Sequence, residues 1–233
     1  MRIFLLSILM VVLASANTST VIGLVQKSDG NVKVKSEGSF KKSKVNTGYE
    51  IKSGDLITTA KKANVVLKLV DGSVLVLDAS SSIHFKDDKN AEQTNGKVFY
   101  KITSRDAKNS LKIKTPFAII GIKGTTFIVN ADENEASVKL QEGLIGIASI
   151  KEDFELYRKD LQKQFNNFMK EQKSAFEEFK QAQRSGFAEI TKEFDLKAGN
   201  TVSFDGNKVD EKTFSENDEA EFQRFKELMK MEP

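Results

Sequence analysis

The residues that could carry out catalytic chemistry in this chain are few, and their spacing matches no recognised catalytic pattern. His84 is the only histidine, and it lies between Ile83 and Phe85 in a strand-like run. The serines at positions 80–82 make a serine–histidine–aspartate arrangement arithmetically possible, but no nucleophile-elbow pattern surrounds them. The serines are therefore interpreted as a polar turn, and the chain is predicted not to be an enzyme.

One segment superficially resembles a phosphate-binding loop, namely GIKGTT at residues 121–126. A phosphate loop needs an earlier glycine at a fixed distance and a helix directly after the loop, whereas here that glycine is missing and a strand-like run follows. We therefore expect no nucleotide and no other cofactor.

A metal site is also not expected. Asp87, Asp88 and Asn90 are spaced faintly like calcium ligands, but the glycine and the distal glutamate of a calcium loop are missing. With one histidine and no cysteine, the chain cannot build a His-rich site or a Cys-based zinc or iron–sulfur site.

The composition limits the classes of partner. The chain has 233 residues, with 36 Lys and Arg against 33 Asp and Glu, a balance that is too even for an electrostatic nucleic-acid surface. The length allows one sizeable domain with an appendage. Nucleic acid is therefore not an expected partner.

The N-terminus is typical of a secretory signal peptide over residues 1–16. An apolar block from Ile3 to Leu13 is followed by small residues up to Ala16, which predicts a mature chain that starts at Asn17. An uncleaved anchor is the alternative, but the block is shorter than the roughly 20 residues of a spanning helix. We therefore expect a periplasmic protein without stable membrane insertion after cleavage.

Residues 17–150 consist of short strand-like runs separated by turn signals. Turns are predicted at Asp29-Gly30, Ser53-Gly54-Asp55, Asp71-Gly72 and Asn95-Gly96, where glycine permits a positive φ. This region is therefore predicted to be mainly β, as a sandwich, a roll or a short solenoid, and with the helical extension described below the overall fold class is α+β. The predicted strand runs are Val21–Val25, Asn31–Lys35, Asn64–Val70, Ser73–Leu77, Lys97–Ile102, Leu111–Lys114, Thr125–Val129 and Ala136–Leu140.

A series of motifs in this region resembles the FecR domain. The motifs are GYEIKSGDLITT at residues 48–59, VDGS at 70–73, KTPFA at 114–118, GIKGTTF at 121–127 and GLIGI at 143–147. The resemblance extends over most of residues 20–150. It implies a compact, solenoid-like or roll-like β domain. Such domains form the periplasmic half of inner-membrane regulators that relay signals from outer-membrane transporters to a sigma factor.

The resemblance implies fold more directly than function. Only the sixteen residues of the predicted signal peptide precede the β domain here, where the regulators carry a cytoplasmic anti-sigma segment and a transmembrane helix. Direct control of a sigma factor is therefore not expected.

The motif residues are interpreted as structural. Gly54 and Gly124 fit positions that need a positive φ or a close backbone approach, and Pro116 is expected at a strand end or a turn because it lacks a backbone donor. The full set of structural motif residues is Gly48, Gly54, Asp55, Asp71, Gly72, Thr115, Pro116, Gly121, Gly124, Thr125, Phe127 and Gly143.

Residues 151–195 are predicted to form a long amphipathic helix. The segment contains one glycine and no proline, and its aromatic residues recur every eleven positions, which predicts a nearly straight stripe along the helix. The stripe consists of Phe154, Tyr157, Phe165, Phe168, Phe176, Phe179, Phe187 and Ile190.

This stripe has to be covered, because exposed aromatic rows are costly in water. The alternatives are packing on the β domain or on a C-terminal helix, self-association as a coiled coil, and a protein partner. Whether the helix is continuous or folds back is left open by the sequence.

The remaining segments are assigned by pattern. Residues 196–210 resemble a terminal strand or hairpin that completes the β domain, with a turn at Asp205-Gly206. Residues 211–233 are predicted to contain a last helix capped by Ser215, packed on the long helix.

The sequence therefore predicts an exported periplasmic protein that acts as a non-catalytic interaction or scaffold module of the cell envelope. The alternative is a component of envelope or outer-membrane signal transduction related to FecR-type regulators.

Overall fold

The computed structural model describes residues 20–103, 110–132, 135–158 and 188–230. The predicted signal peptide, residues 1–16, lies outside these ranges. No helix among the described residues is long and apolar enough to cross a membrane.

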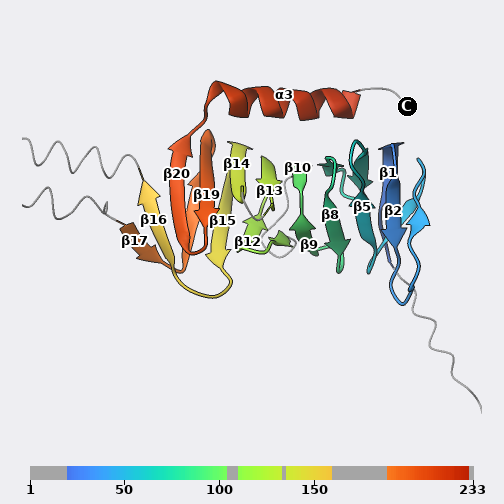
Figure 1. The fold of residues 1–233 in the computed structure, drawn as a ribbon, viewed down its shortest axis with the longest axis horizontal. Coiled ribbons are helices and arrows are strands. Elements are labelled where there is room, and N and C mark those ends of the chain that lie inside the picture. Colours follow the sequence, from blue (N-terminus) through green and yellow to red (C-terminus); the bar gives the residue numbers. More distant parts are fainter. Residues whose placement is uncertain (1–19, 104–109, 133–134, 159–187, 231–233) are drawn as a thin grey trace, which may run out of the picture.

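The described residues form two large β-sheets (Figure 1). Sheet A contains, in spatial order, β17 (Ala188–Thr191), β16 (Phe154–Arg158), β20 (Lys208–Thr213), β19 (Asn200–Asp205), β14 (Ser137–Glu142), β13 (Thr126–Asn130), β10 (Lys97–Lys101), β7 (Val74–Leu77), β6 (Asn64–Leu69), β1 (Val21–Asp29) and β4 (Glu50–Lys52). Sheet B contains β18 (Glu193–Lys197), β15 (Leu144–Ser149), β12 (Ala118–Ile122), β11 (Leu111–Lys114), β9 (Asn90–Asn95), β8 (Ser82–Phe85), β5 (Leu56–Thr59), β2 (Val32–Lys35) and β3 (Ser43–Lys44).

The chain crosses repeatedly between the sheets as it advances along the molecule. Figure 1 shows this advance as colours that change from blue at the β1 end through green and yellow to orange at β19 and β20, with the yellow β16 beyond them. Neighbouring strands pair antiparallel except β9 with β11 and β16 with β20. The prediction of a solenoid is therefore wrong, because the strands alternate in direction within two sheets instead of stacking as equivalent parallel coils.

The core lies between the two sheets and is built by the two-residue period of the strands. In β2 and β11 the apolar side chains are buried while the intervening lysines are exposed. β6, β7, β10 and β13 have longer apolar runs because they are buried on both faces. One face of these strands lines the core, and the other lies under the C-terminal helix.

A buried polar link joins the sheets inside the core. The Tyr100 hydroxyl on β10 donates to Gln93 Oε1 on β9 over 2.8 Å, and Gln93 Nε2 donates to the carbonyls of Gly96 and Val129. The Tyr100 ring stacks on Phe127 with centroids 4.7 Å apart. Burial raises the pKa of Tyr100 well above its ordinary value, so the hydroxyl stays protonated and donates.

The helix α3 (Glu216–Lys230) lies across the outer face of sheet A (Figure 1). Phe222 and Phe225 are fully buried against Phe99, and the Phe225 and Phe99 rings stack at 5.6 Å. Val66, Val76 and Ile128 complete this apolar contact. The expectation that this helix packs on a long helix is wrong, because the second apolar face of sheet A is its partner.

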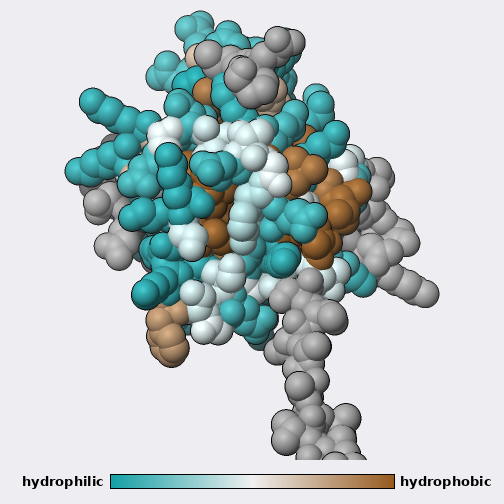
Figure 2. Space-filling model, turned by 90° about the vertical axis from the view of Figure 1, so that its right-hand side faces the viewer, coloured by the Kyte–Doolittle hydropathy of each residue, from teal (hydrophilic) through white to brown (hydrophobic). Residues whose placement is uncertain are grey.

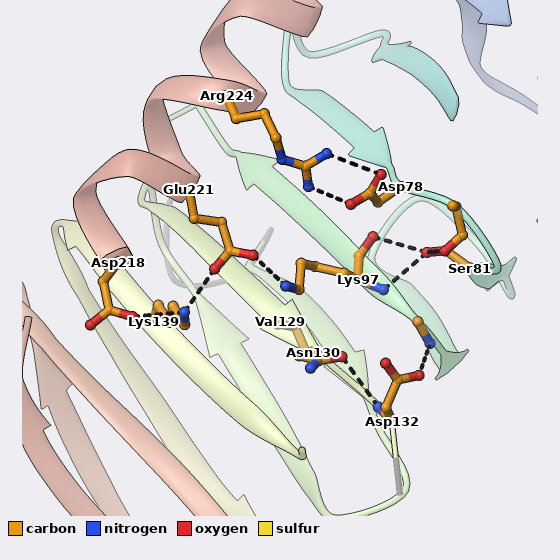
Figure 3. Close-up of polar contacts among 12 residues, drawn as sticks. Asp78, Ser81, Lys97, Val129, Asn130, Asp132, Lys139, Asp218, Glu221 and Arg224 are labelled. Carbon is orange, nitrogen blue, oxygen red and sulfur yellow. Dashed lines mark hydrogen bonds and ion pairs between the residues drawn. The ribbon is translucent and has the colours of Figure 1, made fainter. Parts of the chain in front are cut away.

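Ion pairs surround the apolar contact of α3 (Figure 3). Lys139 Nζ on β14 lies 2.7 Å from both Asp218 Oδ1 and Glu221 Oε2, and Lys97 on β10 also binds Glu221. Nearer the C-terminus of α3, Arg224 pairs with Asp78, which follows β7. The helix is therefore attached by charge to two strands of sheet A and to the residue after a third, as well as by aromatic packing.

These contacts shift the pKa values of the acidic groups. Burial raises the pKa of Glu221, but hydrogen bonds from Lys139 and Lys97 and the charges of both outweigh burial and hold the pKa below its ordinary value. The same balance lowers the pKa of Asp218 through Lys139 and of Asp78 through Arg224. The charged state of each carboxyl therefore favours the docked helix.

The predicted helix over residues 151–195 is wrong at both ends, where the structure has β16, β17 and β18. Phe154 and Leu156 are buried on alternate positions of β16, and Phe194 and Leu196 on alternate positions of β18. This two-residue period is that of a strand, and the eleven-residue spacing of the phenylalanines concealed it. The predictions of a long helical extension, of a coiled coil and of partner binding through the long helix are therefore wrong.

The N-terminal end of the molecule exposes apolar side chains. Figure 2 views this end and shows apolar patches among hydrophilic ones. Val21 and Leu24 on β1 are 40% and 43% exposed, Val70 after β6 is 72% exposed, and Phe40 between β2 and β3 is 100% exposed.

Candidate functional site

The Gly-Asp motif forms a turn that ties the N-terminal strands together. Gly54 has a φ of 88° and donates its backbone N–H to the Phe85 carbonyl. Asp55 is 1% exposed, and its Oδ2 accepts from the Lys52 amide at 2.9 Å and from the Tyr49 hydroxyl at 3.0 Å. The buried carboxylate thus supports the turn after β4.

The Asp-Gly-Ser motif forms the β6–β7 hairpin turn. Asp71 accepts hydrogen bonds from the amide and the hydroxyl of Ser73, at 3.0 and 2.8 Å. Thr103 after β10 also binds Asp71, which fastens the hairpin to the neighbouring strand. Gly72 adopts a φ of 83° at the tip.

The Thr-Pro-Phe motif forms the β11–β12 turn. The Thr115 hydroxyl accepts from the Ala118 amide at 3.0 Å and donates to the Ala118 carbonyl at 2.9 Å. The turn leaves Pro116 exposed and Phe117 half-buried. Pro116, like the motif residues Asp71, Gly72 and Gly143 in other turns, is therefore accessible to another molecule.

The remaining motif residues lie where β13 meets β14 and β15. Gly124 has a φ of 116°, and Gly143 has a φ of 90° with Thr125 and Gly124 packed directly over its Cα. Thr125 is buried, and Phe127 contributes to the core stack with Tyr100. Gly48 also has a positive φ, whereas Gly121 lies within β12 opposite Gly146.

A hollow of about 640 Å³ opens at the loop ends of the two sheets, next to Pro116 and Phe117. It is bordered by the β11–β12, β13–β14 and β19–β20 turns and by the connection from β15 to β16. This volume lies within the roughly 300–1,000 Å³ typical of ligand sites. Its lining residues are Pro116, Phe117, Ala131, Asp132, Ala136, Ser149, Ile150, Lys151, Glu152, Phe154, Phe204, Asp205, Gly206 and Asn207.

Three phenylalanines form the aromatic part of the hollow. Phe204 is at the centre, with ring centroids 4.5 Å from Phe117 and 5.9 Å from Phe154. Phe154 and Phe204 are buried, while Phe117 is partly open to solvent. The open ring offers a face to a bound group.

The polar part of the hollow is mainly acidic. Asp132, Glu152 and Asp205 carry negative charge, against one positive charge on Lys151. Asp132 Oδ1 accepts from the Gly96 amide at 3.2 Å (Figure 3). Within the described ranges, Glu152 and Asp205 form no ion pair.

The chemistry-bearing residues considered from the sequence are not brought together here. His84 lies half-buried on β8, opposite Leu56 and Glu92. Asp87 accepts hydrogen bonds from Lys89 and Asn90 within its own turn. Over the described part of the chain, no group of three or more His, Cys, Asp or Glu side chains is placed to hold a metal ion.

The structure separates the predicted interaction stripe. Phe154 is buried in the core and lines the floor of the hollow, while Tyr157 is half-buried on β16 and Ile190 is 65% exposed on β17. The other stripe residues, Phe165, Phe168, Phe176, Phe179 and Phe187, lie outside the described residues.

Sequence reasoning missed the acidic side of the hollow. Its carboxylates come from three separate connections, and no linear motif contains more than one of them. The Asp205-Gly206 turn was recognised, but only the pairing of β19 with β14 and β20 places it beside the β11–β12 turn.

Comparison with known proteins confirms the resemblance seen in the sequence. Residues 55–146 match the family described as FecR protein. No curated protein matches the chain.

Two crystal structures of a candidate anti-sigma factor from Parabacteroides distasonis are among the solved structures that are similar to this chain. They are 15% identical, with TM-scores of 0.46 and 0.45. Each similarity covers 68% of this chain and 59% of the other, so the chain spans less than two thirds of those proteins.

Proposed function

We propose that this chain is an exported, non-catalytic protein of the cell envelope that takes part in signal transduction by binding another protein at the hollow. The FecR match over residues 55–146 supports the signalling role. The observation that supports binding is that the Thr-Pro-Phe turn of the matched region presents Pro116 and Phe117 at a hollow of about 640 Å³. The alternative role is that of a scaffold, which would bind a partner at the same hollow without relaying a signal.

The test is capture of the partner in the producing cells by the full-length tagged protein, with cross-linking before purification. Phe117→Ala removes the partly open ring of the hollow. Phe40→Ala is the matched control, since Phe40 is 100% exposed at the other end of the molecule. We expect the same cross-linked protein with wild type and Phe40→Ala and its loss with Phe117→Ala.

Unchanged capture by a folded Phe117→Ala variant would exclude the hollow as the contact. Because Phe117 packs on Phe204 at 4.5 Å, the melting temperature of the variant has to be measured alongside. Deleting the gene separates the two roles, because a signalling component changes the expression of other genes and a scaffold does not.

A further inference from the structure

We propose that the hollow binds a basic side chain, lysine or arginine, carried next to an apolar residue in a segment of the partner protein. This inference rests on the proposed function and adds the chemistry of the bound group. It is carried by the combination of an aromatic floor and an excess of unpaired carboxylates at one site.

The charge around the hollow is opposite to that of the molecule. The whole chain has a net charge of +3, whereas the lining has three carboxylates and one lysine. Glu155 adds a further carboxylate nearby, because its Oε1 accepts from Asn207 Nδ2 at 3.4 Å. A cation is therefore favoured at this place on an otherwise basic protein.

The carboxylates are available to a bound cation. Glu152 and Asp205 are exposed and form no ion pair among the described residues. Asp132 uses Oδ1 for the Gly96 amide, which leaves Oδ2 for a ligand. Carboxylates from three connections thus line the same hollow, and none of them is in an ion pair among the described residues.

The aromatic floor explains why the bound group has an apolar part. Phe117 packs on Phe204 with the two rings tilted by 31°, and it is itself partly open, so it can contact the methylene stem of a lysine or arginine and the face of its ring can attract the charged end. Ala131 and Ala136 extend this apolar lining. An anionic group would be repelled by the carboxylates, and a neutral polar group would lack the charge attraction to them.

The Ser149 hydroxyl adds a polar group to the same lining. Its oxygen is buried and has no hydrogen-bond partner among the described residues, although its backbone amide donates to the Lys192 carbonyl at 3.0 Å. The oxygen therefore retains its capacity to accept a hydrogen bond from an ammonium or guanidinium group placed beside it.

The test uses three capped dipeptides, acetyl-Phe-Arg-amide, acetyl-Phe-Gln-amide and acetyl-Phe-Glu-amide, added to the full-length protein. Chemical shifts of the backbone amides of Phe117, Ala136 and Gly206 report binding. We expect the arginine dipeptide to bind most tightly and the glutamate dipeptide least. Binding of the arginine dipeptide should weaken as salt is raised.

The charge variant is Glu152→Gln with Asp205→Asn, and the control is Glu50→Gln with Glu227→Gln, which changes the net charge equally at exposed sites elsewhere. We expect the arginine dipeptide to bind the hollow variant roughly two- to fivefold more weakly for each carboxylate removed. The control should bind as the wild type does.

Equal binding of the three dipeptides, or equal binding by the hollow variant and the control, would overturn this inference. If a partner whose capture depends on Phe117 is still found in either case, the proposed function stands and only the inference about the basic side chain fails. The opposite result is also distinguishable. If the arginine dipeptide binds best and this preference depends on Glu152 and Asp205, the inference is supported. If no partner is captured in the same experiments, only the proposed function fails.

Discussion

At the scale of single residues, Gly124 is the position where backbone conformation most restricts the side chain. Its φ of 116° lies where L residues are rarely found. We expect Gly124→Val to lower the free energy of unfolding by about 1–3 kcal/mol, because a β-branched side chain is strained there. Urea denaturation measures the change.

His84→Ala serves as the comparison for Gly124→Val. His84 lies half-buried on β8 with an ordinary extended backbone, so its replacement should change the free energy of unfolding by much less. Equal unfolding curves for wild type and Gly124→Val would refute the backbone explanation.

Residue-level reasoning predicted the turns well and the hollow poorly. The turn at Asp71 is encoded within three residues, whose side chains and backbone bond one another. The carboxylates Glu152 and Asp205, in contrast, are 53 positions apart and become neighbours only through strand pairing. Local chemistry reveals the first kind of feature and cannot reveal the second.

At the scale of elements, α3 is docked by groups whose charge depends on pH. The pKa values of Glu221, Asp218 and Asp78 are lowered in the folded protein, so these carboxylates stabilise the fold fully at pH values above their ordinary pKa values of 4.5 and 3.8. This stabilisation is lost as the pH falls through the lowered, folded-state pKa values. Burial lowers the pKa of Lys139, but hydrogen bonds to Asp218 and Glu221 and their charges outweigh burial and raise it. The stabilisation that Lys139 provides is therefore complete below pH 10.5, its ordinary pKa, and is lost only as the pH rises above that value.

We therefore expect the melting temperature to fall below about pH 4, as α3 loses its ion pairs. Glu221→Gln should flatten this fall and reduce stability near pH 7 by about 1–2 kcal/mol, because two lysines lose a partner whose side chain is 13% exposed.

Thermal melts from pH 3 to pH 7 test this expectation, with hydrogen exchange at Phe222 and Phe225 to localise the change to α3. Glu219→Gln is the control, since Glu219 is an exposed acid of the same helix. Parallel pH profiles for wild type and Glu221→Gln would show that the ion pairs do not hold the helix.

The wrong helix prediction over residues 151–195 arose because an eleven-residue spacing and a two-residue strand period occur in the same segment. Phenylalanines recur every eleven positions there, yet Phe154 and Leu156 alternate as in a strand. A five-residue strand offers few alternations, so a regular spacing over a longer segment outweighed it. The parallel pairing of β16 with β20 is a contact over a long sequence separation that no local pattern indicates.

At the scale of the whole molecule, the N-terminal segment predicts export of the protein. The pattern of residues 1–16 predicts that mass spectrometry of periplasmic material finds a chain beginning at Asn17. An intact Met1 terminus in the membrane fraction would instead indicate an anchored protein.

The mainly β composition of residues 17–150 was predictable, because the strand runs and turns recur along the chain. The division of the strands into two sheets was not predictable, because the sequence does not show which strands pair or which apolar strand faces pack against each other. The strands that bury both faces, such as β13, are the clearest sign that a third layer covers sheet A.

The edges of both sheets at the N-terminal end bear on how copies of the protein can meet. Sheets that end in long, open strands can join from molecule to molecule into fibres. Here the last strands are β3 and β4, which have only two and three residues and include Lys44 and Lys52. A strand laid beside them would gain few backbone hydrogen bonds. Contacts at this end therefore depend on side chains such as Phe40 and Val70 and not on extension of either sheet from one molecule to the next.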